Sequence, residues 1–539
     1  MCFRWLSAAV MLCCVAKAGS AQRRSAPSPL PVVSAAAMDA HLKFLSDDLL
    51  EGRAPATRGG RLATQYIAAV FQALGLEPAG VGGSYFQPVA LVGMTPQPSL
   101  VWGRGSATAN LAYRDDFVAW AERPVADVAA DGDVVFVGYG IRAPEWRWDD
   151  YKGADLRGKV LLMLVNDPGL VDATVFLGKI FTYYGRWTYK LEEAARQGAA
   201  GAILVHTTES ATYPWDVVRS SWSVEQFKLD QAQSPSLAFA GWVTETAARA
   251  ALARGGWNLD SLTRAAARRD FQPAATGLHA AVRVVSALRR VQSENVAARL
   301  PGSDARLAAQ VVLFTAHWDH KGIGPVVRGD SIYNGAEDNA SGVAAMLAAA
   351  QALAQVTPRP RRSVLFLATT AEESGLLGSE AYVQRPLVPL ARTAAVLNLD
   401  VTNVRGATRD IAALGIDRSS LGPVFQAAAA AESLAVEPQP DVRGSFFRSD
   451  HFPFARAGVP ALSLEPGVDF VGRPKGWGEE QERLYNESRY HQPSDEYQPT
   501  FRYEGLAQQV RVALRVALAV ANAAALPTWL PTSEFQRRP

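Results

Sequence analysis

Cysteine and long apolar runs are scarce in this sequence. Only three cysteines occur among 539 residues, and all three lie within the first 14 positions. The rest of the chain therefore has neither a disulfide scaffold nor a zinc site built on thiolates. Beyond the N-terminus, no apolar stretch reaches the roughly 18 residues that a membrane-spanning helix needs. The nearest one, close to the C-terminus, is interrupted by Arg511 and Arg515.

An excess of one charge is missing as well. The chain has 54 Lys and Arg against 52 Asp and Glu, a formal net charge of +2. This balance gives no electrostatic reason to expect nucleic acid or an anionic membrane as a partner. A hydrophobic content of 48% excludes disorder as the dominant state. At about 100 to 200 residues per domain, the length predicts two to four domains, so function must come from local groups of residues.

The first 21 residues have the three-part pattern of a secretory signal peptide. Arg4 precedes twelve residues without a charge, Trp5–Ala16, and small residues follow. We expect cleavage after Ala18 or Ala21, which would remove all three cysteines and leave no stable membrane anchor. The alternative is a buried N-terminal helix. The signal predicts an extracytoplasmic protein, either periplasmic or secreted, and residues 22–37, rich in Pro, Ser and Ala, predict a flexible leader.

The remaining chain predicts a discontinuous main domain with an insert. Apolar residues at three- and four-residue spacing predict helices over 38–50 and 61–76. Within 126–285, apolar runs separated by glycine-marked turns predict strands around one helix, as in a compact α/β or β-rich unit. We therefore expect the main domain to comprise residues 38–125 and 286–530.

Strands and helices alternate in the C-terminal half. Short apolar runs at 311–314, 364–367 and 394–399 each end at a polar cluster. An apolar stripe within 343–353 predicts a helix between the first two runs. This alternation predicts an α/β fold with a mainly parallel, mixed sheet covered by helices. Ligands bind at the carboxyl ends of the strands in such sheets, so the polar clusters are the candidate site.

Histidines and carboxylates dominate these polar clusters. They are His317 and Asp319 after the first strand, Asp338 at the start of the helix, Glu372 and Glu373 after the second strand, Asp400 after the third, and His491 in a late loop. Imidazole and carboxylate are the ligands that zinc and similar ions accept when sulfur is absent. Such a set suffices for two ions roughly 3.5 to 4 Å apart if one carboxylate bridges them. Each motif alone is common, so their joint placement at strand ends carries the prediction.

The order of these motifs along the chain and their local sequences resemble those of the secreted dizinc aminopeptidase family. Its wider relatives include glutamate carboxypeptidase, glutaminyl cyclase and the transferrin receptor. The segments LKFLSDDLLEGR and YIAAVFQALGL near the start, and RSDHFPFARAGVPALSL before the last histidine, share the resemblance, and residues 126–285 look like a protease-associated domain. The resemblance implies a zinc exopeptidase that hydrolyses N-terminal residues from peptides.

Carried over to this sequence, the resemblance implies that Asp338 bridges two zinc ions per chain. His317 and Asp400 would complete the ligands of one ion, and Glu373 and His491 those of the other. It also implies a cis peptide bond after Asp338, as in relatives.

Three further residues receive roles from the resemblance. Glu372 would act as general base on the water between the ions and pass its proton to the leaving amine. Tyr490 would donate a hydrogen bond to the developing oxyanion, with ordinary aromatic packing as the alternative. Asp319 would fix the tautomer of His317, with a salt bridge as the alternative. His320 is expected to be a solvent or loop histidine.

Several functions remain open. A carboxypeptidase of the same fold would need a basic pocket, for which Arg405, Arg443 and Arg448 are available. A catalytically inactive binding module would have lost ligands, whereas every expected position here carries a competent residue. Glutaminyl cyclase is disfavoured because the full ligand set is present, and a serine hydrolase because no G-x-S-x-G motif occurs. Peptides are the expected partners, and the sequence predicts no oligomeric state.

Overall fold

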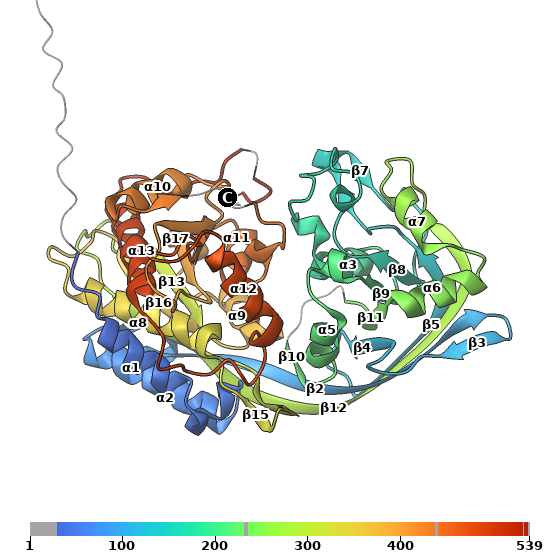
Figure 1. The fold of residues 1–539 in the computed structure, drawn as a ribbon, viewed down its shortest axis with the longest axis horizontal. Helices are drawn as coiled ribbons and strands as arrows, with labels where there is room; N and C mark the ends of the chain where they lie inside the picture. The colour runs from blue at the N-terminus through green and yellow to red at the C-terminus, as the bar shows by residue number, and fades with distance from the viewer. Residues whose placement is uncertain (1–29, 231–235, 437–439, 532, 537–539) are drawn as a thin grey trace, which may run out of the picture.

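The computed structural model describes residues 30–230, 236–436, 440–531 and 533–536. The predicted signal peptide and the first part of the predicted leader lie outside these residues. The described chain forms two lobes joined by two long paired strands, β2 (Phe86–Arg104) and β12 (Ala274–Leu300) (Figure 1). None of the helices in the described ranges is long and apolar enough to cross a membrane.

The first lobe is built on a mixed sheet with the order β19-β18-β20-β17-β13-β16-β12. Its central strands are β13 (Val311–His317), β16 (Ser363–Thr369), β17 (Thr393–Leu399) and β20 (Ala461–Glu465). These four pair in parallel, whereas β12 and β18 (Asp410–Leu414) run antiparallel at the sides. The short strand β19 (Ala435–Val436) pairs with β18 at the edge. The predicted α/β fold with a mainly parallel sheet is confirmed.

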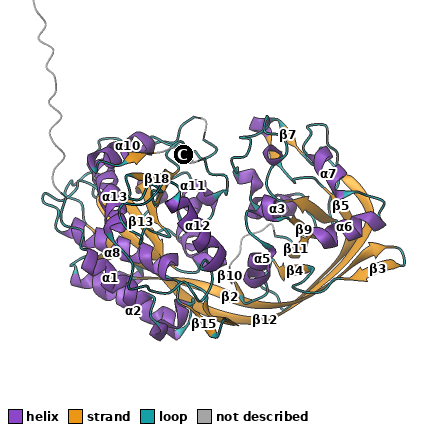
Figure 2. Ribbon diagram, viewed as in Figure 1, coloured by secondary structure: helices purple, strands orange, loops and turns teal. Residues whose placement is uncertain are grey.

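Helices cover both faces of this sheet (Figure 2). One face packs against α1 (Ala35–Leu45), α2 (Arg58–Ala73), α8 (Ser341–Ala354), α10 (Leu421–Ala431) and α13 (Glu504–Asn522). The other face packs against α9 (Leu377–Gln384) and α11 (His451–Arg456). Side chains alternate along β13, so that Val312 and Phe314 enter the first core while Val311 and Leu313 enter the second. Burial on both faces explains why these strands read as continuous apolar runs.

The two N-terminal helices begin about three residues earlier than the periodicity predicted. The hydroxyl of Ser34 accepts a hydrogen bond from the backbone N–H of Ala37, and Thr57 caps α2 in the same way through Gly60. Because these caps satisfy N–H groups that lack a partner in the first turn, they fix where each helix starts. The spacing of apolar residues carries no information about the polar capping residue, so it could not predict these starting points.

The same sheet continues through β12 into the second lobe, in the order β12-β5-β8-β9-β11-β4. The strands of this part are β4 (Phe117–Ala121), β5 (Asp127–Phe136), β8 (Val160–Leu164), β9 (Gly201–His206) and β11 (Phe239–Thr244). The helices of the lobe are α3 (Trp187–Arg196), α4 (Thr208–Ala211), α5 (Trp215–Trp222), α6 (Glu245–Arg254) and α7 (Leu259–Ala266). Apolar cores lie on both faces. β4 pairs with β11 inside this lobe, although the sequence had placed its residues in the main domain, because a single short strand carries no sign of its partner.

The lobes also touch beside the carboxyl ends of the central strands. The backbone N–H of Phe181 donates to the carbonyl of Asp441 at 3.0 Å. Arg456 of the first lobe pairs with Glu192 of the second at 3.2 Å. The second lobe therefore borders the edge of the sheet at which ligands bind in folds of this kind.

Candidate metal centre

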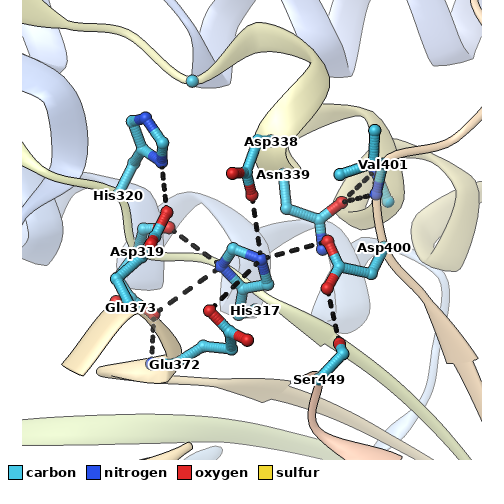
Figure 3. Close-up of polar contacts among 12 residues, drawn as sticks. His317, Asp319, His320, Asp338, Asn339, Glu372, Glu373, Asp400, Val401 and Ser449 are labelled. Atoms are coloured by element: carbon cyan, nitrogen blue, oxygen red, sulfur yellow. Dashed lines mark hydrogen bonds and ion pairs between the residues drawn. The ribbon is translucent and has the colours of Figure 1, made fainter. Parts of the chain in front are cut away.

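The parallel register brings the predicted site residues to one edge of the sheet. His317 is the last residue of β13 and lies opposite Thr369 of β16, while Asp400 directly follows β17. The remaining groups stand on loops at the same edge. These are Asp338 in the turn before α8, Glu372 and Glu373 in the turn after β16, and His491 beyond α12 (Trp477–Ser488). The structure brings all six side chains together (Figure 3 shows all but His491).

Asp338 stands between two histidines. Its Oδ1 lies 3.2 Å from Nε2 of His317, and its Oδ2 lies 3.4 Å from Nε2 of His491. The same nitrogen of His317 is 3.2 Å from Oδ1 of Asp400, and that of His491 is 3.0 Å from Oε2 of Glu373. Two groups of nitrogen and oxygen atoms thus share one carboxylate.

The backbone at Asp338 has the expected cis bond. The Asp338–Asn339 peptide is cis, which confirms that prediction. Asn339 is buried and ties the turn to its surroundings: its Nδ2 donates to the carbonyl of Leu399 at 3.0 Å, and its Oδ1 accepts from the N–H of Gly342 at 2.9 Å. Asn339 therefore links the start of α8 to the end of β17.

Asp319 contacts His317 through its main chain. The Nδ1 of His317 lies 3.1 Å from the carbonyl oxygen of Asp319, whereas the nearest carboxylate oxygen is 4.0 Å away. That carboxylate instead accepts the backbone N–H of Glu372 at 3.2 Å. A carbonyl accepts only from a protonated nitrogen, so this contact leaves Nε2 of His317 free as a ligand atom. Burial raises the pKa of Asp319 to about 7.

Two residues after Asp319 reach the site without having been predicted there. His320 is 1% exposed, and its Nδ1 lies 2.6 Å from Oε1 of Glu373. Lys321 places Nζ 2.8 Å from Oε2 of the same carboxylate. His320 was expected to be a solvent or loop histidine. It lies in a loop but is buried, because the chain after β13 folds back over Glu373. His320 and Lys321 lie in the segment HWDHK, which begins with the predicted ligand His317. This closeness in sequence could have indicated that they reach the site.

Negative charge is concentrated in the centre. Burial raises the pKa of Glu372 well above its usual value, and the charges of Asp400 and Glu373 raise it further. Burial also disfavours the charged imidazole of His317, yet Asp400 and Glu372 hold its pKa well above the usual range. Buried carboxylates facing one another need a compensating positive charge. Since the donors are imidazole nitrogens and carboxylate oxygens, the centre fits zinc or a similar divalent ion.

Residues 295–517 match the model of Peptidase family M28. These residues are called the M28 segment below. Leupeptin-inactivating enzyme 1 of Streptomyces exfoliatus is 32% identical over 155 residues, which are 28% of this chain and 34% of that protein. Aminopeptidase YwaD of Bacillus subtilis is 30% identical over 188 residues, 34% of this chain and 36% of that protein. The chain thus spans about a third of the length of each of these two relatives.

The similarity to solved structures covers more of the chain. The aminopeptidase from Aneurinibacillus sp. strain AM-1 matches over 94% of this chain and 98% of that chain, with 20% identity and a TM-score of 0.50. At this level of identity the match shows a shared fold. All six residues of the centre fall inside the M28 segment.

A cavity of about 410 Å³ opens onto the candidate metal centre. Glu372 and Asp400 lie on its wall, as does Tyr490, whose ring stacks on that of His491 with 3.8 Å between centroids. This size lies within the range of small-molecule sites.

The three arginines considered for a basic pocket also line this cavity. Arg405 pairs with Glu337, and Arg443 pairs with Glu482 at 2.8 Å. Arg448 has no acidic partner among the described residues. Two of the three are thus already neutralised by carboxylates.

Proposed function

We propose that this chain is a zinc-dependent exopeptidase that removes N-terminal residues from peptides. The observation that carries the proposal is the placement of Asp338, whose two oxygens face His317 and His491 at 3.2 and 3.4 Å. A carboxylate in that position suits a bridge between two ions. The family of residues 295–517 and the names of the relatives support peptide hydrolysis.

The proposed cofactors are two zinc ions per chain. Asp338 would hold both, with His317 and Asp400 completing one set of ligands and Glu373 and His491 the other. When bound, the ions supply a Lewis acid for the scissile carbonyl and acidify water between them. His320 and Lys321 also contact the carboxylate of Glu373, at 2.6 Å and 2.8 Å, and so restrain it beside His491.

Glu372 is the proposed general base. It accepts a proton from the attacking water and delivers it to the leaving amine, the transfer that a positioned carboxylate performs. Its backbone N–H is held by the carboxylate of Asp319 at 3.2 Å, so Asp319 acts as a positioning residue for the base. Tyr490, on the wall of the cavity, would donate a hydrogen bond to the oxygen that gains charge.

We further propose that residues 126–285 form a protease-associated domain inserted between 38–125 and 286–530. The separate apolar cores of the second lobe support an insert. The strand β4 (Phe117–Ala121) pairs with β11 in the same lobe, so the proposed insert would begin somewhat before residue 126. An extracytoplasmic location, periplasmic or secreted, rests on the pattern of the first 21 residues.

A carboxypeptidase and an inactive binding module are the competing functions. Comparing the hydrolysis of aminoacyl anilides with that of N-blocked dipeptides separates an aminopeptidase from a carboxypeptidase, because only an aminopeptidase needs a free amine beside the scissile bond. Release of the aniline with no cleavage of blocked dipeptides is the expected result. Cleavage of blocked dipeptides alone would favour the carboxypeptidase. A protein that holds two zinc ions yet cleaves neither substrate would favour the binding module.

A further inference from the structure

One carboxylate on the wall of the cavity is neither a proposed metal ligand nor part of an ion pair. It is Glu465, the last residue of β20, and it lines the cavity together with Glu372 and Asp400. Its side chain is partly buried and forms no ion pair with any described residue. The carboxylate is therefore free to contact a ligand in the cavity.

The register of the sheet places Glu465 beside the proposed metal ligand Asp400. Leu399 of β17 lies opposite Leu464 of β20 in a parallel pair, so the next residues along the two strands are Asp400 and Glu465. Both leucines enter the first core. Because side chains alternate along a strand, Asp400 and Glu465 project from the opposite face of the sheet, where both line the cavity.

Hydrogen bonds join the other polar side chains at this end of the two strands. Nδ2 of Asn398 donates to the hydroxyl of Ser463 at 3.3 Å and to that of Ser449 at 2.8 Å. The hydroxyl of Ser449 in turn donates to the carboxylate of Asp400. The face on which Glu465 lies is thus fixed by contacts between β17 and β20, and Glu465 continues it toward the open cavity.

The arginines on the cavity wall are held by other groups. Two of the three pair with carboxylates other than Glu465, as described above. The third, Arg448, donates from Nη2 to the hydroxyl of Thr212 at 2.7 Å and lies over the ring of Tyr213, 5.5 Å from its centre. The described residues therefore supply no positive partner for Glu465.

The surroundings of Glu465 suit a long side chain with a positive end. Leu414, Val468 and Phe470 line the same cavity and offer it apolar walls. Burial and the nearby charge of Asp400 raise the pKa of Glu465 to about 8. A carboxylate in such a place is costly to ionise alone, and a cation beside it removes much of that cost.

We propose that Glu465 binds the positively charged side chain of an N-terminal arginine or lysine and thereby selects the substrate. This inference rests on the proposed exopeptidase function, which places the first residue of a peptide in the cavity. Guanidinium and ammonium groups form strong, charge-assisted hydrogen bonds with a carboxylate. The aliphatic part of the same side chain packs against the apolar walls. The enzyme accordingly favours peptides that begin with a basic residue.

The anilides of arginine and citrulline test the inference, because the two side chains have nearly the same shape and only arginine is charged. On the zinc-loaded native enzyme, kcat/KM for the arginine anilide should be at least about tenfold above that for the citrulline anilide, a difference of about 1.4 kcal/mol. Equal rates on the two anilides would overturn the inference and leave the proposed aminopeptidase activity standing.

Glu465→Gln keeps the size of the side chain and removes its charge. It should slow cleavage of the arginine anilide far more than that of the citrulline anilide, so that the preference disappears, and the zinc content should stay native. Asp469→Asn is the matched control, since Asp469 is exposed, pairs with Arg409 and does not line the cavity. This control should keep the preference. An equal fall on both anilides, or loss of zinc, in Glu465→Gln would overturn the inference, because Glu465 would then serve the metals or the free amine of every substrate.

A binding measurement makes the result independent of turnover. The reaction products L-arginine and L-citrulline are titrated calorimetrically into the zinc-loaded protein. Arginine should bind at least about tenfold more tightly than citrulline to the native protein, and the two should bind equally to Glu465→Gln. Equal binding to the native protein would overturn the inference even if the enzyme cleaves anilides. A preference for arginine in a protein that cleaves no anilide would instead reject the proposed function and keep the cation site.

Discussion

The carboxylate of Asp495 accepts a hydrogen bond from the backbone N–H of Asp338, at 3.1 Å from Oδ2. Its other oxygen accepts the N–H of Glu337, also at 3.1 Å. Arg489 closes the arrangement by pairing with Glu337 at 2.8 Å. The proposed bridging residue is thus fixed through its main chain by a residue of the same loop that carries His491.

Asp495→Ala should weaken zinc binding without removing any ligand. The change leaves two buried N–H groups without an acceptor, so the Asp338 turn is expected to shift. Loss of such a supporting contact typically costs about 10- to 100-fold in metal affinity. Zinc titration against a competing chelator measures the effect, with Asp469→Ala, at an exposed aspartate paired with Arg409, as the control. Unchanged affinity would show that Asp495 does not position the bridge.

Glu372→Gln and Asp338→Ala should separate chemistry from metal binding. The glutamine keeps the shape of the side chain but cannot accept a proton, so both metals should stay while kcat falls by about 10²- to 10⁴-fold. Asp338→Ala should lose metal binding itself. Zinc content and turnover are measured on each purified variant, with Glu479→Gln, on the exposed first turn of α12, as the control. Near-native turnover in Glu372→Gln would remove it as the base.

Removing the metals should lower thermal stability as well as activity. Without them, buried carboxylates around Asp338 and Glu372 face one another, and binding to the folded state alone stabilises it by about 2.7 kcal/mol at a hundredfold excess over Kd. Dialysis against a chelator should lower Tm, and added zinc should restore it. Asp338→Ala should show no response to zinc. A Tm that is indifferent to zinc in the native protein would contradict a metal site in this cluster.

His451 should make the fold sensitive to acid. It is fully buried, with its ring 4.7 Å from that of Phe446, and burial lowers its pKa from 6.5 to about 3. Between these values the unfolded chain takes up a proton that the folded chain does not, so stability falls as pH drops through this window. At about 1.4 kcal/mol per pKa unit, the loss between pH 6.5 and 5 is about 2 kcal/mol.

Urea unfolding at pH 6.5 and pH 5 measures this contribution. His451→Phe should lose less stability on acidification than the native protein. His279→Gln is the control, because His279 is exposed and the neighbouring Asp131 and Asp133 raise its pKa, so it should not reduce the acid sensitivity. The same pH dependence in His451→Phe and the native protein would rule out His451 as its source.

The parts of the site that lie on strands and their ends were predictable from the sequence. His317 and Asp400 follow apolar runs, and parallel strands end at one edge of a sheet, so their meeting follows from the pattern. Glu337, Asp495 and Arg489 could not be found this way, because their contacts depend on how a late loop folds onto the Asp338 turn.

Contacts between the lobes were equally hidden. Glu192 and Arg456, which pair across the lobes, are 264 positions apart, and nothing local in either segment indicates the other. His320 was misjudged for a related reason: whether a loop residue faces solvent depends on where the loop turns after the strand. The sequence indicates which side chains of a single helix or strand are buried. Contacts between side chains of different elements become apparent only in the folded chain.

Zinc content and aminopeptidase activity, measured on one sample of the full chain, test the proposed function most directly. A zinc-loaded preparation should contain about two zinc ions per chain, the number that a shared carboxylate implies, and should release aniline from aminoacyl anilides. Chelation should abolish both, and zinc should restore them together. A preparation that binds no zinc after loading, or that cleaves aminoacyl anilides equally well when stripped of metal, would contradict the proposal.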